Sequence, residues 1–188
     1  MQRPHWDIVL IARNEAKTLP RLLGSLSQFK EFGGRVFIVD TGSKDETVEV
    51  ARSWGATVTD VGDRFRIIIS KEQAEAINTQ LVVEGEEAVI KEGDSLFDFS
   101  SARNFAASLA TQDWIWMPDC DEAFTQLDIP AINAAIADPE IDILRYDFVF
   151  SHDEQGEPAI SFSHAKMYRK DKVQWRGRVH EVLSNIRG

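Results

Sequence analysis

Two carboxylates separated by one residue, Asp119 and Asp121, follow the apolar run Trp114–Met117. Such a run predicts a buried strand, and ligands of open α/β sheets bind beyond the carboxyl ends of strands. Paired carboxylates at this position suit a hard divalent cation such as Mg²⁺ or Mn²⁺, which prefers oxygen ligands and often shares them with substrate phosphates. The alternative is an exposed acidic turn.

Polar side chains follow two other predicted buried strands. Arg13 and Glu15 come after the run 7–12, and Asp40 comes after the run 35–39. Parallel strands bring their carboxyl ends to one edge of a sheet, so these side chains are expected near Asp119. An aspartate there can accept hydrogen bonds from a ribose or a base. The same loops could instead serve only as helix caps and turns.

Two further candidates lie in the C-terminal half of the chain. Arg103 falls in the first turns of a predicted helix over 100–109, where its guanidinium either contacts a phosphate or stays on the surface. His180 could meet a metal or a phosphate, and Glu181 could act as a base. The fourth residue after His180 is Ser184 and not histidine, so this is not a zinc-protease helix. A purely structural His-Glu pair is the alternative.

The pattern of elements predicts an α/β sheet to position these side chains. Apolar runs at 7–12, 35–39 and 57–61 alternate with helical patterns that Asn14 and Asp45 could cap. Repeated strand and helix units are typical of a parallel sheet with right-handed crossovers. The remaining expected elements are a helix at 100–109, a strand at 114–117, a helix at 129–136, a strand at 141–150, and strand-like segments at 164–168 and 173–182.

Residues 66–96 interrupt this alternation. The segment holds three β-rich runs, at 67–69, 81–83 and 88–90, with a turn-like Glu84-Gly85-Glu86 before the last. The pattern predicts an inserted hairpin or small antiparallel sheet. The whole chain, 1–188, is then a single domain with a β-rich insertion.

Charge and composition disfavour several classes of function. Lys+Arg is 21 and Asp+Glu is 31, which gives a net charge of −10. Such a surface suits neither non-specific nucleic-acid binding nor docking on an anionic membrane. Cys120 is the only cysteine, so no intramolecular disulfide can form. No window approaches about 18 apolar residues and no signal peptide is evident, so we expect a soluble, cytoplasmic protein without a transmembrane segment.

Five ordered blocks resemble the family-2 glycosyltransferases of the GT-A fold, and among them the subgroup with VDTGSxDxT and FSxARNxA motifs. The blocks are Val39–Thr47 (VDTGSKDET), Phe99–Ala106 (FSSARNFA), Trp114–Glu122 (WIWMPDCDE), Lys166–Arg169 (KMYR) and Trp175–Glu181 (WRGRVHE). The resemblance covers roughly residues 6–65 and 97–183. It implies an α/β fold with a mostly parallel central sheet and leaves 66–96 as the insertion.

The resemblance also implies a role for each candidate residue. The implied nucleotide-binding residues are Ala12, Arg13 and Glu15 lining the pocket, Asp40 at the base or ribose, and Arg103 near the nucleotide or diphosphate. Asp119 is implied both as a nucleotide-binding residue and as a metal ligand.

The metal and the reacting centre are implied in the same way. Asp119 and Asp121 match the family's Asp-x-Asp motif, whose last carboxylate usually holds Mn²⁺ or Mg²⁺. His180 and Glu181 match a motif near the reacting centre, with His180 as a third candidate metal ligand. Cys120 replaces a usually small residue, and we expect no catalytic thiol there.

The function implied is metal-dependent, inverting transfer of a sugar from a nucleotide-diphosphate sugar to a hydroxyl of a glycan, lipid or protein acceptor. The cation would neutralise the leaving diphosphate, and Glu181, or else Asp147, would take the hydroxyl proton. A non-catalytic nucleotide-sugar or protein-binding module is the second hypothesis. A sugar nucleotidyltransferase is the third, although ARNEAKTLP after the first strand lacks the glycine-rich loop of those enzymes. Family members commonly continue past the position of Gly188, so the chain is expected to be the N-terminal part of a longer protein or else a minimal enzyme.

Overall fold

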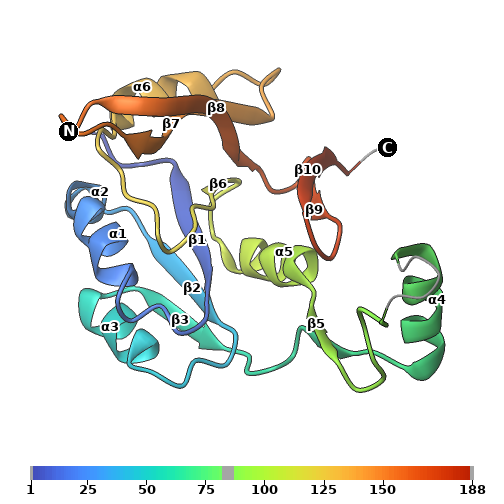
Figure 1. Cartoon of the computed structure of the whole chain (residues 1–188). Helices are drawn as coiled ribbons and strands as arrows, with labels where there is room; N and C mark the ends of the chain where they lie inside the picture. Colours follow the sequence, from blue (N-terminus) through green and yellow to red (C-terminus); the bar gives the residue numbers. More distant parts are fainter. Residues whose placement is uncertain (1, 82–86, 187–188) are drawn as a thin grey trace.

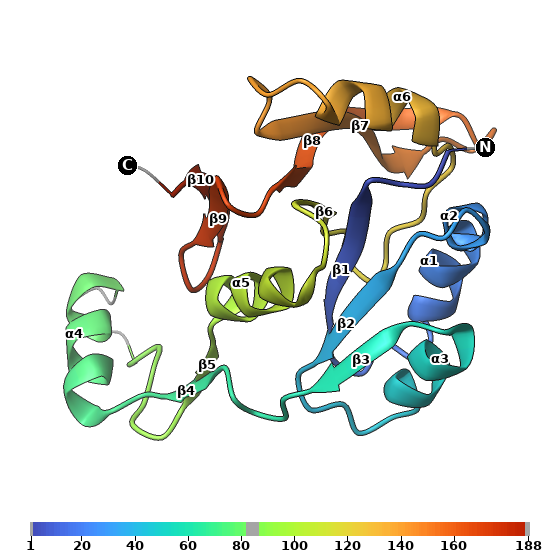
Figure 2. The same ribbon diagram turned by 180° about the vertical axis from the view of Figure 1, so that it is seen from behind.

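A six-stranded sheet forms the centre of the computed structural model, which describes residues 2–81 and 87–186 (Figures 1 and 2). The strand order is β3-β2-β1-β6-β8-β7. The strands are β1 (Trp6–Ala12), β2 (Val36–Asp40), β3 (Thr57–Asp60), β6 (Trp114–Trp116), β7 (Ile143–His152) and β8 (Pro158–Arg169). The pairs from β3 through β6 are parallel, and β8 is antiparallel to both β6 and β7. The predicted α/β class with a mostly parallel central sheet is confirmed.

Helices pack on the sheet, except α4 (Lys71–Leu81), which stands away from it beside one of two small ribbons (Figure 1). The other helices are α1 (Leu19–Ser25), α2 (Ser27–Glu31), α3 (Thr47–Trp54), α5 (Phe99–Leu109) and α6 (Ile129–Ile136). The two-stranded ribbons are β4 (Arg66–Ile68) with β5 (Ser95–Phe97), and β9 (Val173–Arg176) with β10 (Val182–Asn185). Within the described ranges, no helix is long and apolar enough to cross a membrane.

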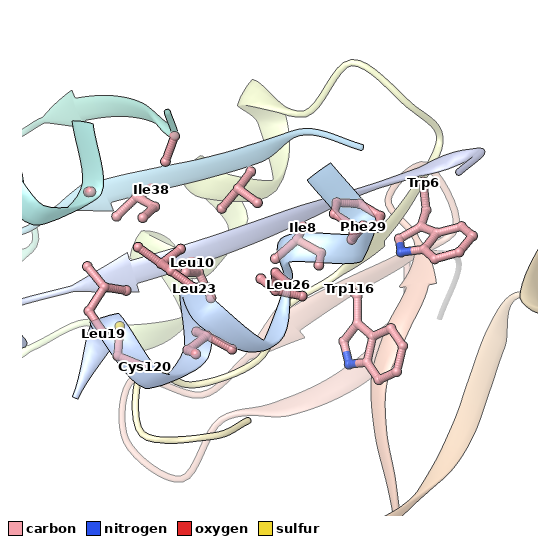
Figure 3. Packing of buried hydrophobic residues seen from close by; sticks show 14 of the residues in the cluster. Trp6, Ile8, Leu10, Leu19, Leu23, Leu26, Phe29, Ile38, Trp116 and Cys120 are labelled. Carbon is pink, nitrogen blue, oxygen red and sulfur yellow. The ribbon is translucent and has the colours of Figure 1, made fainter. Parts of the chain in front are cut away.

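Strand β1 lies at the centre of the core and contributes apolar side chains to both faces of the sheet. Ile8 and Leu10 pack with Leu23 and other residues of α1 and α2, as Figure 3 shows. Val9 points to the opposite face and packs in a second cluster with Ala106 of α5. Side chains alternate between the faces of a strand, so one continuous apolar run fills both layers. This pattern is the one that made β1 recognisable in the sequence.

The predicted element order holds outside the insertion. The strands expected at 7–12, 35–39, 57–61, 114–117 and 141–150, and the helices expected at 100–109 and 129–136, agree with the observed bounds within two residues. β8 begins at Pro158, several residues before the expected 164, because it pairs with β7 as a long antiparallel hairpin.

The β-rich prediction for residues 66–96 is correct only at the two ends of the segment. Strands β4 and β5 do form an antiparallel pair. Between them, however, 71–81 is helix α4, because Lys, Glu, Gln and Ala favour helices, and Ala74 and Ile77 lie three residues apart on its less exposed side. The run 88–90 is loop, held by the side chain of Asn78, which bonds the backbone of residues 89 and 90. The rest of the predicted middle run and the turn at 84–86 lie outside the described residues.

The two predicted helix caps have different outcomes. Asn14 does not cap a helix, since α1 begins at Leu19 and Asn14 has a left-handed φ of 57°. Its side chain instead accepts a hydrogen bond from the Lys44 N–H and so joins the loops after β1 and β2. Asp45 does act at a helix start, because its carboxylate accepts from the N–H of Thr47, the first residue of α3.

A buried carboxylate anchors the connection between α5 and β6. Asp7 of β1 is 1% exposed. It accepts hydrogen bonds from the backbone N–H groups of Thr111 and Gln112 and from the guanidinium of Arg35. The loop that these bonds fix leads from α5 into β6, so Asp7 sets how these two elements lie beside each other.

We expect Asp7→Ala to lower the free energy of unfolding by about 2 to 3 kcal/mol, because it removes a charged acceptor of several part-buried hydrogen bonds. Urea unfolding followed by circular dichroism measures this. Asp113→Ala is the matched control, since Asp113 is exposed in the same loop and should change stability by less than about 0.5 kcal/mol. Equal effects of the two substitutions would contradict an anchoring role for Asp7.

Candidate functional site

A cavity of about 610 Å³ lies at the carboxyl ends of β1, β2 and β6. The residues predicted from the sequence that line it are Ala12, Arg13, Glu15, Arg103, Asp119 and Asp121. Their convergence follows from the parallel pairing of β1 with β2 and β6, which brings three loops to one edge of the sheet. A second cavity of about 470 Å³, beside α2 and the start of α6, is lined by none of the predicted residues.

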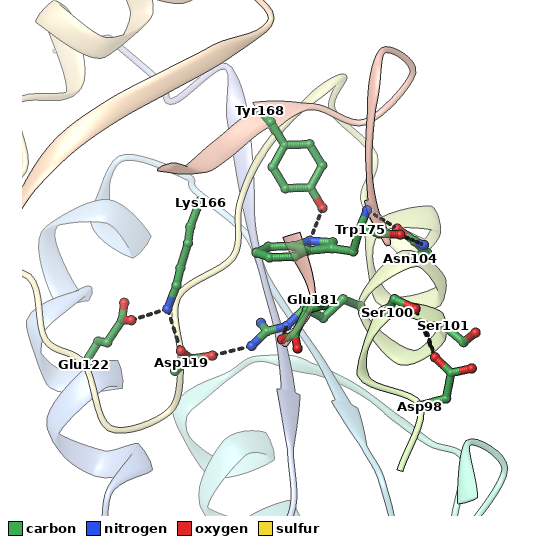
Figure 4. A network of polar contacts seen from close by, with 11 residues as sticks. Asp98, Ser100, Ser101, Asn104, Asp119, Glu122, Lys166, Tyr168, Trp175 and Glu181 are labelled. Carbon is green, nitrogen blue, oxygen red and sulfur yellow. Dashed lines mark hydrogen bonds and ion pairs between the residues drawn. The ribbon is translucent and has the colours of Figure 1, made fainter. Parts of the chain in front are cut away.

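A network of ion pairs forms the floor of this cavity (Figure 4). The guanidinium of Arg103 donates from Nη2 to Asp119 at 2.7 Å and from Nε to Glu181 at 2.8 Å. The ammonium of Lys166 on β8 contacts the other oxygen of Asp119 and also Glu122. Arg103 and Lys166 are 7% and 5% exposed, so both cations are buried. The network joins α5, β8 and the loop after β6.

The helix that carries Arg103 is fixed at its start and along its length. The carboxylate of Asp98 accepts from the N–H of Ser101 and caps α5. The amide of Asn104 exchanges two hydrogen bonds of 2.9 Å with the backbone of Trp175. The indole of Trp175 in turn lies 4.9 Å from the Arg103 guanidinium. These contacts dock the segment that holds His180 and Glu181 against α5.

Burial and the neighbouring cations shift the pKa values of the carboxylates in the network in opposite directions. Burial would raise the pKa of Asp119, but attraction by Arg103 and Lys166 outweighs it and the pKa is lowered. At Glu122 burial outweighs the attraction of Lys166, and the pKa is raised. Burial also raises the pKa of Cys120, whose side chain packs in the core, so the expectation of no catalytic thiol agrees with the structure.

The predicted set of three metal ligands is not assembled. Among residues 2–81 and 87–186, no group of three or more His, Cys, Asp and Glu side chains is arranged to hold a metal ion. Both oxygens of Asp119 bind cationic side chains. His180 is exposed, has a left-handed φ of 56°, and does not line the cavity. That Asp119 and His180 are direct metal ligands stays a prediction.

Asp121 differs from Asp119 in being exposed and in lining the cavity without an ion pair to any described residue. The charged residues of the cavity lining are three arginines and three carboxylates, so their charges cancel. A dianionic diphosphate therefore gains no net balancing charge from the lining alone. Mg²⁺ is commonly held by one or two carboxylates and completed by waters and substrate phosphates. The donor set fits a divalent ion on Asp121 whose remaining ligands come from such a substrate.

Arg13 and Glu15, which were predicted to line the nucleotide pocket, are held by hydrogen bonds to neighbouring loops. Arg13 donates to the carbonyl oxygen of Thr41 at 2.8 Å and to Asp63 at 3.0 Å. The backbone N–H of Glu15 donates to the hydroxyl of Thr47 at 2.7 Å. These bonds hold the loop after β1 against the loops after β2 and β3.

Asp40 is placed differently from the other predicted residues. It is 2% exposed and is not part of the cavity lining. Its Oδ2 accepts from the N–H groups of Gly42 and Ser43, whereas its Oδ1 is buried without a partner among the described atoms. Asp40 thus shapes the turn after β2, where Gly42 has a φ of 93° and lies close to Gly62. Its contact with a base or ribose stays a prediction.

The candidate bases occupy two different places. Glu181 is largely buried, with 14% of its side chain exposed, and is bound to Arg103. Asp147 is exposed on β7, opposite Ser163 of β8, where neighbouring residues 146 and 148 face the aromatic side of that hairpin. The structure brings Glu181, and not Asp147, into the network with Asp119.

Sequence reasoning assigned no role to Lys166 or Glu122, although both lie in the quoted motif blocks. It also assigned none to Asp63, Arg66 and Phe97, the last two of which line the cavity. The pattern of β8 (PAISFSHAKMYR) mixes polar and apolar residues and so did not mark Lys166. For the ribbon residues the sequence carried no signal, because their place depends on how β4 and β5 pair.

Comparison with known proteins gives one family and several distant relatives. The model of the family described as "Glycosyl transferase family 2" matches residues 7–81 and 70–185. A TPR repeat-containing protein of Synechococcus elongatus is 24% identical over 95% of this chain and 35% of its own length. The 4,4'-diaponeurosporenoate glycosyltransferase of Staphylococcus aureus is 48% identical over 30% of this chain and 15% of its own length.

Solved structures resemble the chain at lower similarity. The mannosyltransferase PcManGT from Pyrobaculum calidifontis, solved in complex with GDP-Man and Mn²⁺, is 20% identical, with a TM-score of 0.47 over 76% of this chain and 35% of that one. The chain spans about a third or less of the length of each of these relatives.

We expect Arg103→Ala to lower the free energy of unfolding by about 3 kcal/mol, because Glu181 then loses its described cationic partner and Asp119 keeps only Lys166. Arg178→Ala is the matched control, since Arg178 is 59% exposed in its pair with Asp98 and should cost less than about 0.5 kcal/mol. Urea denaturation at neutral pH measures both. A loss in Arg103→Ala no larger than that of the control would show that the network does not support the fold.

Proposed function

Because the chain belongs to glycosyl transferase family 2, we propose that it is a metal-dependent, inverting glycosyltransferase that moves a sugar from a nucleotide-diphosphate sugar to an acceptor hydroxyl. The observation that carries this proposal is the cavity at the strand ends. It brings Arg13, Arg103 and the two carboxylates of the Asp-x-Asp motif together, and it leaves Asp121 without an ion pair to any described residue.

Asp121 is the proposed ligand of Mn²⁺ or Mg²⁺, together with the donor diphosphate. When bound there, the ion would act as a Lewis acid that neutralises the charge developing on the leaving nucleoside diphosphate. Asp119 has a different proposed role. Its ion pairs with Arg103 and Lys166 hold the loop after β6 so that Asp121 faces the cavity.

Arg103 is the proposed contact to the donor phosphates. Its Nε and Nη2 are bound to Glu181 and Asp119, while Nη1 has no partner among the described atoms. Nη1 is buried beside the cavity that Arg103 lines, so a phosphate that displaces the groups covering Nη1 would receive a charge-assisted hydrogen bond from it. The fixed orientation of the other two nitrogens means that little side-chain entropy is lost when that bond forms.

Glu181 is the proposed general base. Its side chain is bound to Arg103 in the network with Asp119, and a carboxylate can accept a proton from an acceptor hydroxyl. Direct attack of that hydroxyl on the anomeric carbon, opposite the leaving diphosphate, inverts the configuration there. Asp147 and His180 are weaker candidates because neither lines the cavity or joins the network.

The remaining parts of the proposal concern the whole protein. We propose a cytoplasmic protein with a single catalytic domain over 1–188 that carries the insertion at 66–96. Its donor is a nucleotide-diphosphate sugar and its acceptor is a glycan, a lipid or a protein. The same cavity also supports a second candidate, a module that binds a nucleotide sugar without turning it over. Neutralisation of Asp119 by two cations favours that candidate, because it removes one carboxylate of the motif from metal binding.

We expect a nucleoside diphosphate with Mn²⁺ to raise the melting temperature of the wild-type protein, and Asp121→Asn to lose the Mn²⁺-dependent part of the rise. A ligand at about 100 times its Kd adds about 2.7 kcal/mol of stability, which a thermal-shift screen of UDP, GDP, dTDP, CDP and ADP detects. Asp113→Asn, an exposed substitution outside the cavity, should behave as wild type. The absence of any shift in the wild-type protein would overturn the donor site.

We expect Glu181→Gln to keep the nucleotide-dependent shift and to slow sugar transfer or donor hydrolysis by about 10²-fold or more, because glutamine cannot take the proton. Release of nucleoside diphosphate from the preferred donor measures turnover. Wild-type protein that binds the donor but never releases it would favour the binding module. Unchanged turnover in Glu181→Gln would move the base to another residue.

A further inference from the structure

The inserted segment reaches the cavity through the β4–β5 ribbon. Arg66 lies opposite Phe97 in the antiparallel register, and both line the cavity. Residues opposite each other in a ribbon share one face, so Arg66, Phe97 and the adjacent Ser95 present a single surface. In Figure 1 the ribbon leaves the sheet after β3 and returns at the start of α5. One wall of the cavity is therefore built by the part of the chain that interrupts the α/β pattern.

The guanidinium of Arg66 is held in place by neighbours on both sides. Its Nε donates to Asp63 at 3.2 Å, and its Nη1 donates to the hydroxyl of Ser95 at 2.6 Å. The same oxygen of Asp63 accepts from Arg13 at 3.0 Å. One carboxylate thus ties the ribbon to the loop after β1. A guanidinium fixed at its edge in this way leaves its flat face available for stacking.

Two aromatic rings stand beside this guanidinium in the cavity lining. Phe97 and Phe99 meet edge to face, with ring centroids 4.8 Å apart and planes at 77°. Phe99 is 37% exposed. Edge-to-face packing keeps these two rings from stacking flat on each other, and both rings line the cavity. Aromatic rings that line a cavity rich in charged groups suit a ligand with both a flat apolar part and an anionic part.

The strand order shows which part of a donor would meet this wall. Asp121 follows β6, whereas Asp63 and Arg66 follow β3, on the far side of β1 and β2. Arg66 is connected through Asp63 and Arg13 to the carbonyl of Thr41, after β2. The diphosphate is assigned to the β6 end under the proposed function. The nucleoside then extends toward the ends of β2 and β3, where the ribbon stands.

We propose that Arg66 and Phe97 form a nucleobase-binding wall of the donor site, and that the insertion thereby helps to select the base. The proposal rests on the proposed function. It assigns the flat guanidinium and the aromatic ring to stacking contacts with the base, whereas the phosphates remain with Asp121 and Arg103.

The test compares binding of the preferred nucleoside diphosphate with binding of inorganic pyrophosphate, both with Mn²⁺, by isothermal titration calorimetry. We expect Phe97→Ala and Arg66→Ala each to raise the Kd of the nucleoside diphosphate by about tenfold, as for loss of one stacked base contact. Their effect on the Kd of pyrophosphate should stay within about twofold. Pyrophosphate binding that is retained in Phe97→Ala and Arg66→Ala separates loss of stacking from misfolding.

Matched controls come from the same segment. Arg64→Ala removes an arginine that stacks on Phe65 and Phe105 and does not line the cavity. Ile68→Ala truncates an apolar side chain on the same ribbon, 61% exposed and outside the cavity lining. Both should leave the two Kd values unchanged.

The outcomes separate this inference from the proposed function. Equal losses for the nucleoside diphosphate and for pyrophosphate would place Arg66 and Phe97 at the phosphates and overturn the base wall. No loss in Phe97→Ala and Arg66→Ala, with binding intact in the wild-type protein, would overturn it while the donor site stands. Wild-type protein that binds no nucleoside diphosphate would overturn both.

Discussion

The geometry of the site depends on the two ion pairs that the Asp119 carboxylate makes with buried cations. Arg103 comes from α5, Lys166 comes from β8, and Asp119 comes from the loop after β6. Burying either cation alone would cost several kcal/mol of lost hydration, so each needs the shared carboxylate nearby. With Glu122 and Glu181 as outer partners, the cations are compensated only when all three elements are in place. Folding of these elements and assembly of the site are thus the same event.

The two carboxylates of the Asp-x-Asp motif therefore have different surroundings. Asp119 lines the cavity, and its two oxygens are occupied by the buried cations Arg103 and Lys166. Asp121, two residues later, stands at the cavity and carries no ion pair in the described part of the chain. Residues 120 and 121 form a turn beyond the end of β6, so the two acids are not held on one face as residues i and i+2 of a strand would be.

The sequence predicted well what depends on local pattern. Strand β1 could be recognised because a run buried on both faces is apolar throughout, and the loops that follow β1, β2 and β6 could be placed together because parallel strands share one edge. Helix α4 was missed because short apolar runs in the insertion fit a strand as well as a helix. The sequence predicts a helix cap at Asn14, because asparagine is a common capping residue. The bond that Asn14 makes to Lys44 joins two loops, and a local pattern does not reveal it. Lys166 and Arg66 were given no role because their partners are distant in sequence and a one-dimensional pattern does not encode them.

The shared carboxylate of Asp63 has a consequence for how the protein can change over evolutionary time. It is the bond that links the inserted ribbon to Arg13, and it lies on the opposite side of the cavity from the network around Asp119. Substitutions, lengthening or shortening within the insertion can therefore reshape one wall while the buried ion pairs and Asp121 keep their places. The network around Asp119 tolerates little change, because its buried cations need their carboxylate partners. The inserted ribbon carries no such requirement and is free to vary.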